Sequence, residues 1–180
     1  MRLPIPYRPE ADVLAPLLQR LQDLDWALAS GDAIGWIGQV RAAKPSAFAM
    51  ETLLREVIRL KADDAQAYNA LGYSLADRGV RLDEAHQLVS KALELAPNDP
   101  FISDSLGWVE FKRGRLQEAI QILDKAFQSK PDPEIAAHLG EVLWVAGQRS
   151  RATAIWKQGV ALSRDNETLQ DTMRRFNVKP

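Results

Sequence analysis

The stretch LGWVEFKRGRLQEAIQILDKAF, residues 106–127, contains a Leu-Gly pair, a second glycine and an apolar pattern that includes alanine. Apolar residues such as Ile120 and Leu123 recur at the spacing of one helical face. Gly114, between the two halves, can adopt the left-handed conformation that ends a helix. Gly107 has no side chain that would hold a second helix at a distance. The stretch therefore predicts two helices that are joined by a tight turn and packed closely together.

The same pattern recurs along the chain at a period near 34 residues, so the stretch is one copy of several. Each copy has a Leu-Gly pair, a turn glycine seven residues later, an alanine beyond the turn, and another small residue seven positions further on. The anchors are Leu71-Gly72, Leu106-Gly107 and Leu139-Gly140; Gly79, Gly114 and Gly147; Ala85, Ala119 and Ala152; and Ala92, Ala126 and Gly159. Pro97 and Pro131 end the first two copies.

Residues between the copies predict where the helices begin. Asp99-Pro100 and Asp132-Pro133 are typical of an N-cap followed by proline in the first turn, where the missing N–H costs least. Small residues on the second helix of each copy leave hollows for the mid-helix glycines of the first. Each copy is therefore expected to be an antiparallel helix hairpin.

Two irregularities interrupt the period. The first copy has one extra residue between Gly79 and Ala85, and the third has one residue fewer between Pro131 and Leu139 than the second has at the same place. Both are expected in loops, where insertions and deletions are tolerated.

These anchors resemble those of the tetratricopeptide repeat family, whose unit of about 34 residues is a helix-turn-helix with Leu-Gly in the first helix, Ala in the second and Pro at its end. The resemblance covers roughly residues 65–164. It implies an all-α solenoid of stacked antiparallel hairpins.

Residues on both sides of the three repeats predict further helices. Upstream, Ile37-Gly38 and residues 50–64 resemble a degenerate copy, and residues 11–29 have the pattern of one more helix. Downstream, residues 166–176 carry apolar side chains at helical spacing and predict a cap helix. The expected domains are N-terminal helices with a degenerate repeat (1–64), three repeats (65–164) and a C-terminal cap helix (165–180).

The span from Tyr68 to Trp156 also resembles the C-terminal repeats of proteobacterial envelope adaptors with tetratricopeptide repeats, some of which are lipid-anchored. The chain has no cysteine, so the anchoring residue of such lipoproteins is absent. If the chain is a trimmed envelope protein, the resemblance implies a periplasmic location. The start MRLPIPYRPE has no apolar signal-peptide core and no run of 18 apolar residues follows, which favours the cytoplasm and predicts no spanning helix.

In the tetratricopeptide repeat family, side chains of the first helix of each hairpin line a concave groove that binds other proteins. Counted from Ala65, Pro100 and Pro133, the groove positions of this chain carry several aromatic residues, which bury a large area with few rotamers to freeze. The candidate partner-binding residues are Asn69, Tyr73, Asp104, Trp108, Phe111, Glu141 and Trp144.

The alternative for these aromatic residues is the core, because aromatic side chains at helical spacing often pack inside a solenoid. Trp156 falls on a second helix, at a position that normally packs within the stack. Glu110 departs from the family pattern, since its position is usually apolar. It is expected either to extend to the surface or to pair with Lys112, Arg113 or Arg115.

Composition excludes several classes of protein. A net charge of −1 gives no basic field for nucleic acid. The two histidines, His86 and His138, are more than one repeat apart, and no HExxH, phosphate loop or GxSxG motif is present. No catalytic residue, metal or cofactor is therefore expected. Both histidines are expected to lie at the surface or to be hydrogen-bonded structural residues.

The sequence thus predicts a protein–protein interaction scaffold that binds a peptide or helix in the groove of its repeats, and not an enzyme. An apolar partner segment with some Lys or Arg would suit the carboxylates Asp104 and Glu141. Three alternatives stay open at this point. The chain could be a self-assembling scaffold that forms homo-oligomers, the C-terminal fragment of a longer envelope adaptor, or an enzyme or a fragment of one.

Overall fold

The structure, a computed structural model, describes residues 47–179 of the chain. The backbone divides into two units, with the boundary between Ala62 and Asp63. In the first unit the described residues form the helix α3 (Ala47–Leu60), along which Leu53 and Val57 are buried.

Helix α3 confirms that most of the segment 50–64 is helical, and it begins three residues before that segment. The helix predicted over residues 11–29 and the Ile37-Gly38 pair lie outside the described residues. The pairing that would make them a degenerate repeat with α3 stays a prediction.

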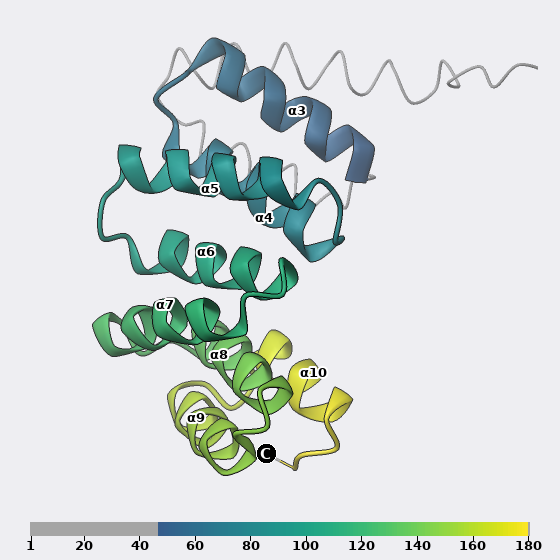
Figure 1. Cartoon of the computed structure of the whole chain (residues 1–180), viewed down its shortest axis with the longest axis vertical. Coiled ribbons are helices and arrows are strands. Elements are labelled where there is room, and N and C mark those ends of the chain that lie inside the picture. The colour runs from purple at the N-terminus through teal and green to yellow at the C-terminus, as the bar shows by residue number, and fades with distance from the viewer. Residues whose placement is uncertain (1–46, 180) are drawn as a thin grey trace, which may run out of the picture. The chain divides into compact units, whose positions relative to one another are not determined.

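In the second unit the described residues form an all-α stack of antiparallel hairpins (Figure 1), as the repeat pattern predicts. Each hairpin joins a first helix to a second helix, and one further helix follows the third hairpin. The helices are α4 (Ala65–Asp77), α5 (Leu82–Leu95), α6 (Pro100–Lys112), α7 (Leu116–Ser129), α8 (Pro133–Val145), α9 (Arg149–Leu162) and α10 (Glu167–Arg175). Within residues 47–179, none of the helices has the length and apolar character needed to cross a bilayer.

The first helix of every hairpin begins at a carboxylate that caps its free N–H groups. Asp64 accepts from the backbone N–H of Ala67 at 3.0 Å. Asp99 accepts from the N–H of Ile102 at 3.1 Å, and Asp132 plays the same part in α8. Since a carboxylate at this place satisfies donors that have no partner inside the helix, the caps fix where each hairpin starts.

The three turn glycines end the first helices as expected, all with positive φ. In the second hairpin Gly114 has a φ of 83°. The N–H of Arg115 donates to the carbonyl of Glu110 at 2.9 Å, and the N–H of Gly114 donates to that of Phe111. This pair of bonds is the Schellman motif, which turns the chain back along its own helix.

The mid-helix glycines are buried at the contact between the two helices of a hairpin. A Cβ on Gly72 would lie 2.6 Å from Val89 Cγ2, and a Cβ on Gly107 would lie 2.5 Å from Leu123 Cγ. Contacts of this length do not occur between real atoms, so only glycine allows the observed separation of the helices. We call this contact the glycine seam; Gly140 forms it in the third hairpin.

Both irregularities of the period lie in loops. The extra residue of the first copy is accommodated by Arg81, which precedes α5 and has a φ of 49°. The loop before α6 contains Asn98, with a φ of 65°, whereas the corresponding loop before α8 is one residue shorter. Each additional residue thus adopts the left-handed conformation, and the helices keep their register.

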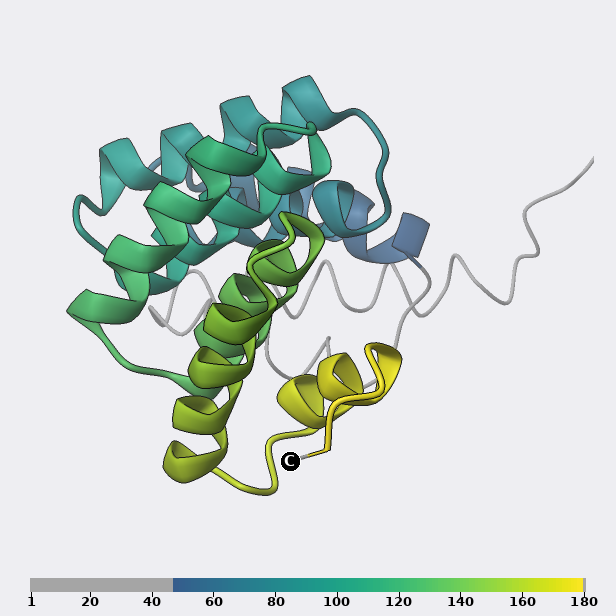
Figure 2. The same ribbon diagram turned by 60° about the horizontal axis from the view of Figure 1, so that its bottom comes forward.

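Helix α10 repeats the register of the first helices and packs against α8 and α9 (Figure 2). Its N-cap Asn166 corresponds to Asp132, and its Leu169 is buried as Ile135 is in α8. The exposed Arg174 stands where α8 has Gly140. Helix α10 therefore has an apolar side toward the stack and a polar side at the position of the glycine seam, as a capping element requires.

Candidate functional site

The candidate residues lie on the first helices α4, α6 and α8, on what we call the first-helix face. This face is defined by the candidate residues together with His138. Trp108 has 4% of its surface exposed, Asp104 6% and Glu141 7%. The other four candidates, Asn69, Tyr73, Phe111 and Trp144, are half-buried.

His138 brings several of these residues together. Its Nδ1–H donates to Asp104 Oδ2 at 2.8 Å, and its Nε2 lies 3.3 Å from the Tyr73 hydroxyl oxygen. Its ring stacks on Trp108 with a centroid distance of 4.5 Å. Trp108 also packs against Phe111 at 5.1 Å. His138, in the third hairpin, thus contacts candidate residues from the first and second hairpins.

The charge of His138 is controlled by its neighbours. Burial lowers the pKa of the imidazole, but the Asp104 carboxylate raises it, through its charge and its hydrogen bond, and the net result is a raised pKa. Glu141 and Glu134 on the same helix act in the same direction. A buried imidazole with a carboxylate at hydrogen-bond distance holds its proton more strongly than one in water.

Trp108 is covered on several sides. Besides His138 and Phe111, the ammonium of Lys112 lies 4.9 Å from the centre of its ring, within cation–π range. The same ammonium donates to the backbone carbonyl of Asp77 at 3.1 Å, which connects α6 to the end of α4. Trp108 is therefore packed as a core residue, and its role as a partner anchor stays a prediction.

Glu141 is bound by the last helix. Arg175 of α10 donates to both of its carboxylate oxygens, at 2.6 and 3.3 Å, and to the Thr172 hydroxyl at 3.1 Å. Such a two-pronged pair is geometrically specific. The carboxylate of Glu141 is thus already paired, which leaves Asp104 as the candidate carboxylate with an unpaired oxygen.

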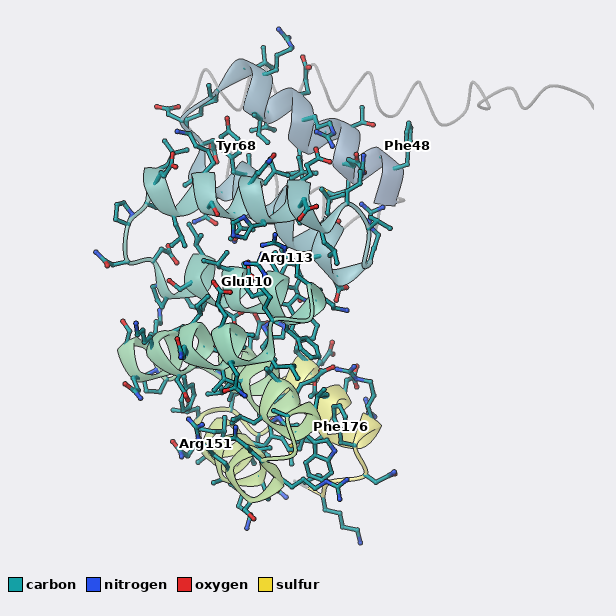
Figure 3. All side chains as sticks on the ribbon, viewed as in Figure 1. Phe48, Tyr68, Glu110, Arg113, Arg151 and Phe176 are labelled. Carbon is teal, nitrogen blue, oxygen red and sulfur yellow. The ribbon has the colours of Figure 1, made fainter. Side chains whose placement is uncertain are left out.

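Trp144 lies in a second aromatic group, apart from His138. It stacks on Trp156 at 5.5 Å and contacts Phe176, which follows α10 and is labelled in Figure 3, at 5.7 Å. Trp156 is fully buried and its indole N–H donates to the Ala137 carbonyl at 3.4 Å, which confirms its predicted structural role. Trp144 helps to hold α9 and α10 together.

Three polar atoms of the first-helix face are buried without a hydrogen-bond partner. They are the side-chain carbonyl oxygen of Asn69, Asp104 Oδ1 and the indole nitrogen of Trp108. The first two accept hydrogen bonds and the third donates one. Each unpaired atom of this kind costs about 1–3 kcal/mol. The face therefore holds unused hydrogen-bonding capacity of both kinds.

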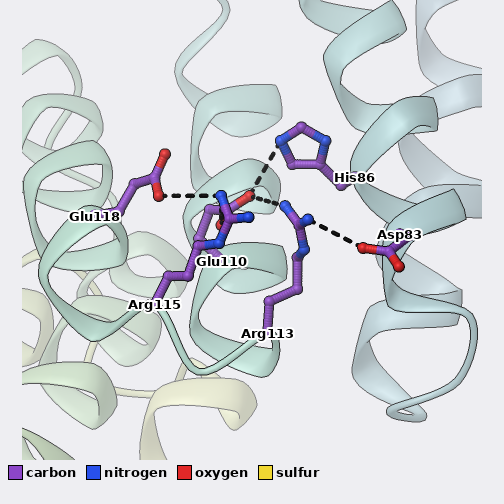
Figure 4. A network of polar contacts seen from close by, with 6 residues as sticks. All are labelled: Asp83, His86, Glu110, Arg113, Arg115 and Glu118. Atoms are coloured by element: carbon purple, nitrogen blue, oxygen red, sulfur yellow. Dashed lines mark hydrogen bonds and ion pairs between the residues drawn. The ribbon is translucent and has the colours of Figure 1, made fainter.

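Glu110 of α6 lies away from His138 and its contacts, on the side of α6 that faces α5 and α7, where it is fully buried (Figure 4). Its carboxylate accepts from Arg113 at 2.9 Å and pairs with Arg115 at 3.5 Å, as predicted for two of its three suggested partners. His86 of α5 lies 3.2 Å from it, and Arg113 also reaches Asp83 of α5.

Burial lowers the pKa of the Arg113 guanidinium, but the hydrogen bonds and charges of Glu110 and Asp83 raise it by more. The net result is a raised pKa, so Arg113 stays charged. The network joins the first hairpin to the second. Its charged side chains are paired with one another and so have a structural role. Among residues 47–179, no three His, Asp or Glu side chains form a group that could hold a metal ion.

Two residues that contact the candidate residues, His138 and Arg175, are not among those predicted from the sequence. His138 is adjacent to the groove position Ala137 and one helical turn from Glu141, a spacing that could have marked it. Arg175 follows Glu141 by 34 residues, one full period, and thus continues the register onto α10. The prediction instead favoured Trp108 and Trp144, because aromatic residues are frequent at the groove positions.

Comparisons with known proteins point to one family. The chain is 52% identical over 92 residues to the TPR repeat-containing protein PA4667 of Pseudomonas aeruginosa, a match that covers 51% of this chain and 16% of that protein. It is 30% identical over 82 residues to the mitochondrial import receptor subunit TOM70 of Rattus norvegicus, covering 46% of this chain and 13% of the receptor. No protein-family model matches the chain.

Among solved structures, the thermophilic TPR protein TTC0263 of Thermus thermophilus has a TM-score of 0.60 to this chain at 18% identity, covering 92% of this chain and 97% of the other. At that identity the likeness concerns the fold. The chain spans less than a fifth of the length of the two sequence relatives described above.

Proposed function

Because the chain is a tetratricopeptide repeat (TPR) protein, we propose that it holds a peptide or helical segment of another protein on its first-helix face. TPR proteins are in general protein–protein interaction scaffolds and are typically not enzymes. The finer assignment, to this face and to a segment of defined chemistry, is supported by the unused hydrogen-bonding atoms next to half-buried aromatic side chains.

The polar atoms of the face match a peptide backbone. Asn69 and Asp104 each have an acceptor for an N–H group, and the Trp108 indole has a donor for a carbonyl. Because these atoms are buried in the free protein, a partner would pair with them only after the side chains that cover them moved aside. A partner that paired all three would recover the cost of leaving them unpaired in the free protein. This complementarity is the observation that carries the proposal.

The aromatic side chains supply apolar contact beside these atoms. Tyr73 and Phe111 are half-buried, so each has surface left to cover. Asp104, with its unpaired oxygen, and the nearby Glu134 favour a partner with Lys or Arg next to its apolar residues. Trp108 would form the floor on which such a segment rests.

Site-specific photo-crosslinking in cells tests the location of the contact. A photoreactive amino acid is placed at Phe111 or Tyr73, and, as matched controls, at the exposed apolar residues Leu162 and Val80, which lie off the first helices. We expect one crosslinked partner from the first pair of positions and none from the controls. Equal crosslinking from all four positions would refute a defined site, and crosslinks to a second copy would favour the self-assembling scaffold.

Affinity measurements then test the contribution of one side chain. With the crosslinked partner segment as ligand, Phe111→Ala is expected to weaken binding by about tenfold, the usual effect of truncating an aromatic anchor. Leu162→Ala is the control and should leave the affinity unchanged. If Phe111→Ala binds as tightly as the parent protein, Phe111 is not an anchor.

A further inference from the structure

His138 connects helices that are not neighbours in the stack. It belongs to α8 in the third hairpin, whereas Asp104 belongs to α6 and Tyr73 to α4, 65 residues earlier in the chain. In a repeat protein most contacts join adjacent units. The bond between Tyr73 and His138 spans the second hairpin, so the side chain of one residue links all three first helices.

The proton on His138 decides how these bonds are made. In the neutral ring, Nδ1–H donates to Asp104 and Nε2 accepts from the Tyr73 hydroxyl. In the protonated ring both nitrogens donate, so the hydrogen bond to Tyr73 reverses its direction and the bond to Asp104 becomes an ion pair. The stacked Trp108 ring, 4.5 Å away, also favours a cation over a neutral imidazole.

Other charged groups around His138 favour the proton. Glu134 and Glu141 lie on the same helix, and Asp104 is supplied by α6. Two cations lie behind the residues that surround His138. Arg175 of α10 is bound to Glu141, and Lys112 of α6 lies over the Trp108 ring. The Asp104 carboxylate is buried with one oxygen unpaired, so its compensating charge must come from His138.

We propose that His138 is the positioning residue of the first-helix face, and that its protonation locks α4, α6 and α8 into one arrangement. The lock sets the spacing of Tyr73 and Trp108. Its effect on partner binding rests on the function proposed above, whereas the lock itself is a property of the free protein. A partner segment would accordingly meet a more rigid face at low pH than at high pH.

The histidine signals in the NMR spectrum of the free protein test the first step. The chain has only two histidines, so His86→Gln assigns both signals. We expect the His138 signal to titrate above the ordinary imidazole value of about 6.5. The midpoint should fall in Asp104→Asn, which removes the ion pair. It should fall by less in Tyr73→Phe, because the hydroxyl bonds both forms of the ring but bonds the imidazolium more strongly.

A His138 midpoint at the ordinary value, or one that Asp104→Asn leaves in place, would overturn the ion pair. A midpoint that Tyr73→Phe leaves unchanged would remove α4 from the lock.

Thermal stability tests the second step. Because the pKa of His138 is raised by folding, its stabilising effect is complete below the unfolded value, near pH 6.5, and is lost as pH rises through the folded value. The melting temperature of the parent protein minus that of His138→Gln should therefore be larger at low pH than at high pH. Asp104→Asn, which removes the carboxylate that binds His138, should make this pH-dependent difference smaller.

Parallel pH profiles of the parent protein and His138→Gln would refute the lock. If His138→Gln does not fold, the profile of Tyr73→Phe replaces it, with a larger loss of stability expected at low pH and the same refuting outcome. Since all of these measurements use the free protein, their failure is separate from a failure of the crosslinking test of partner binding.

Discussion

Gly140 of α8 lies directly against the indole ring of Trp156 on α9, with no space for a methyl group between them. The same contact joins Gly107 to Leu123 and Gly72 to Val89 in the other hairpins. The close approach of each helix pair thus depends on the absence of one side chain and the presence of another.

Gly140→Ala should destabilise the protein although alanine favours helices. The gain in helix propensity is about 1 kcal/mol, but a Cβ at this position would overlap a large, fully buried ring. Overpacking of this kind typically costs about 1–3 kcal/mol. Urea unfolding measures the difference, and a net stabilisation would show that the seam can open without cost.

Trp156→Ala tests the same contact from the other side. Alone it should cost about 3–5 kcal/mol through the cavity it leaves. Added to Gly140→Ala, it should cost less than the sum of the two single effects, because the overlap disappears with the ring. Additive effects would mean that the two residues do not meet.

Trp108→Ala should lower stability more than Phe111→Ala does. Trp108 is 4% exposed and contacts His138, Phe111 and Lys112, so its truncation should cost about 3–5 kcal/mol. Phe111 is half-buried and its truncation should cost clearly less. Denaturant unfolding of both variants checks the order. A reversed order would place Trp108 at the surface.

Glu110→Ala should be strongly destabilising because it leaves Arg113 without its main partner between α5 and α6. Breaking a buried ion pair from one side costs about 3–5 kcal/mol, whereas replacing both partners by apolar side chains is often close to neutral. The double change Glu110→Leu with Arg113→Leu should therefore recover most of the loss. Equal unfolding free energies for Glu110→Ala and the double variant would contradict this account.

Glu141→Gln should loosen α10 without unfolding the stack. The Arg175 side chain is 57% exposed, so the pair contributes at most about 1 kcal/mol. Hydrogen exchange in α10 should become faster while exchange in α6 stays the same. Arg174→Gln is the control, because Arg174 pairs with Asp171 on its own helix. Faster exchange in both variants would show that any charge loss on α10 has this effect.

The hairpins could be predicted from the sequence because local residues determine them. Gly114 supplies the left-handed turn and Asp99 supplies the helix cap, and both act within a few residues of their position. Their recurrence at one period was enough to place each described repeat helix close to its observed start and end.

The interior of the site could not be predicted in the same way. Whether Trp108 is open or covered depends on how strongly the stack curves, and curvature is set by packing between hairpins. The partner of His138 on α4 is 65 residues away, and no local pattern connects the two positions. The groove positions of a repeat family identify side chains that share a face, but they leave open how deeply each is buried.

The glycine and the bulky residue of each seam lie within one hairpin, in helices that follow each other along the chain. A gene segment that encodes one hairpin therefore carries both halves of the contact. Duplication, loss or exchange of such a segment would preserve every seam, whatever the size of the residue that fills it. The protein can thus change in length by whole units during evolution, while bonds between units, such as that of Arg113 with Asp83, must be rebuilt each time.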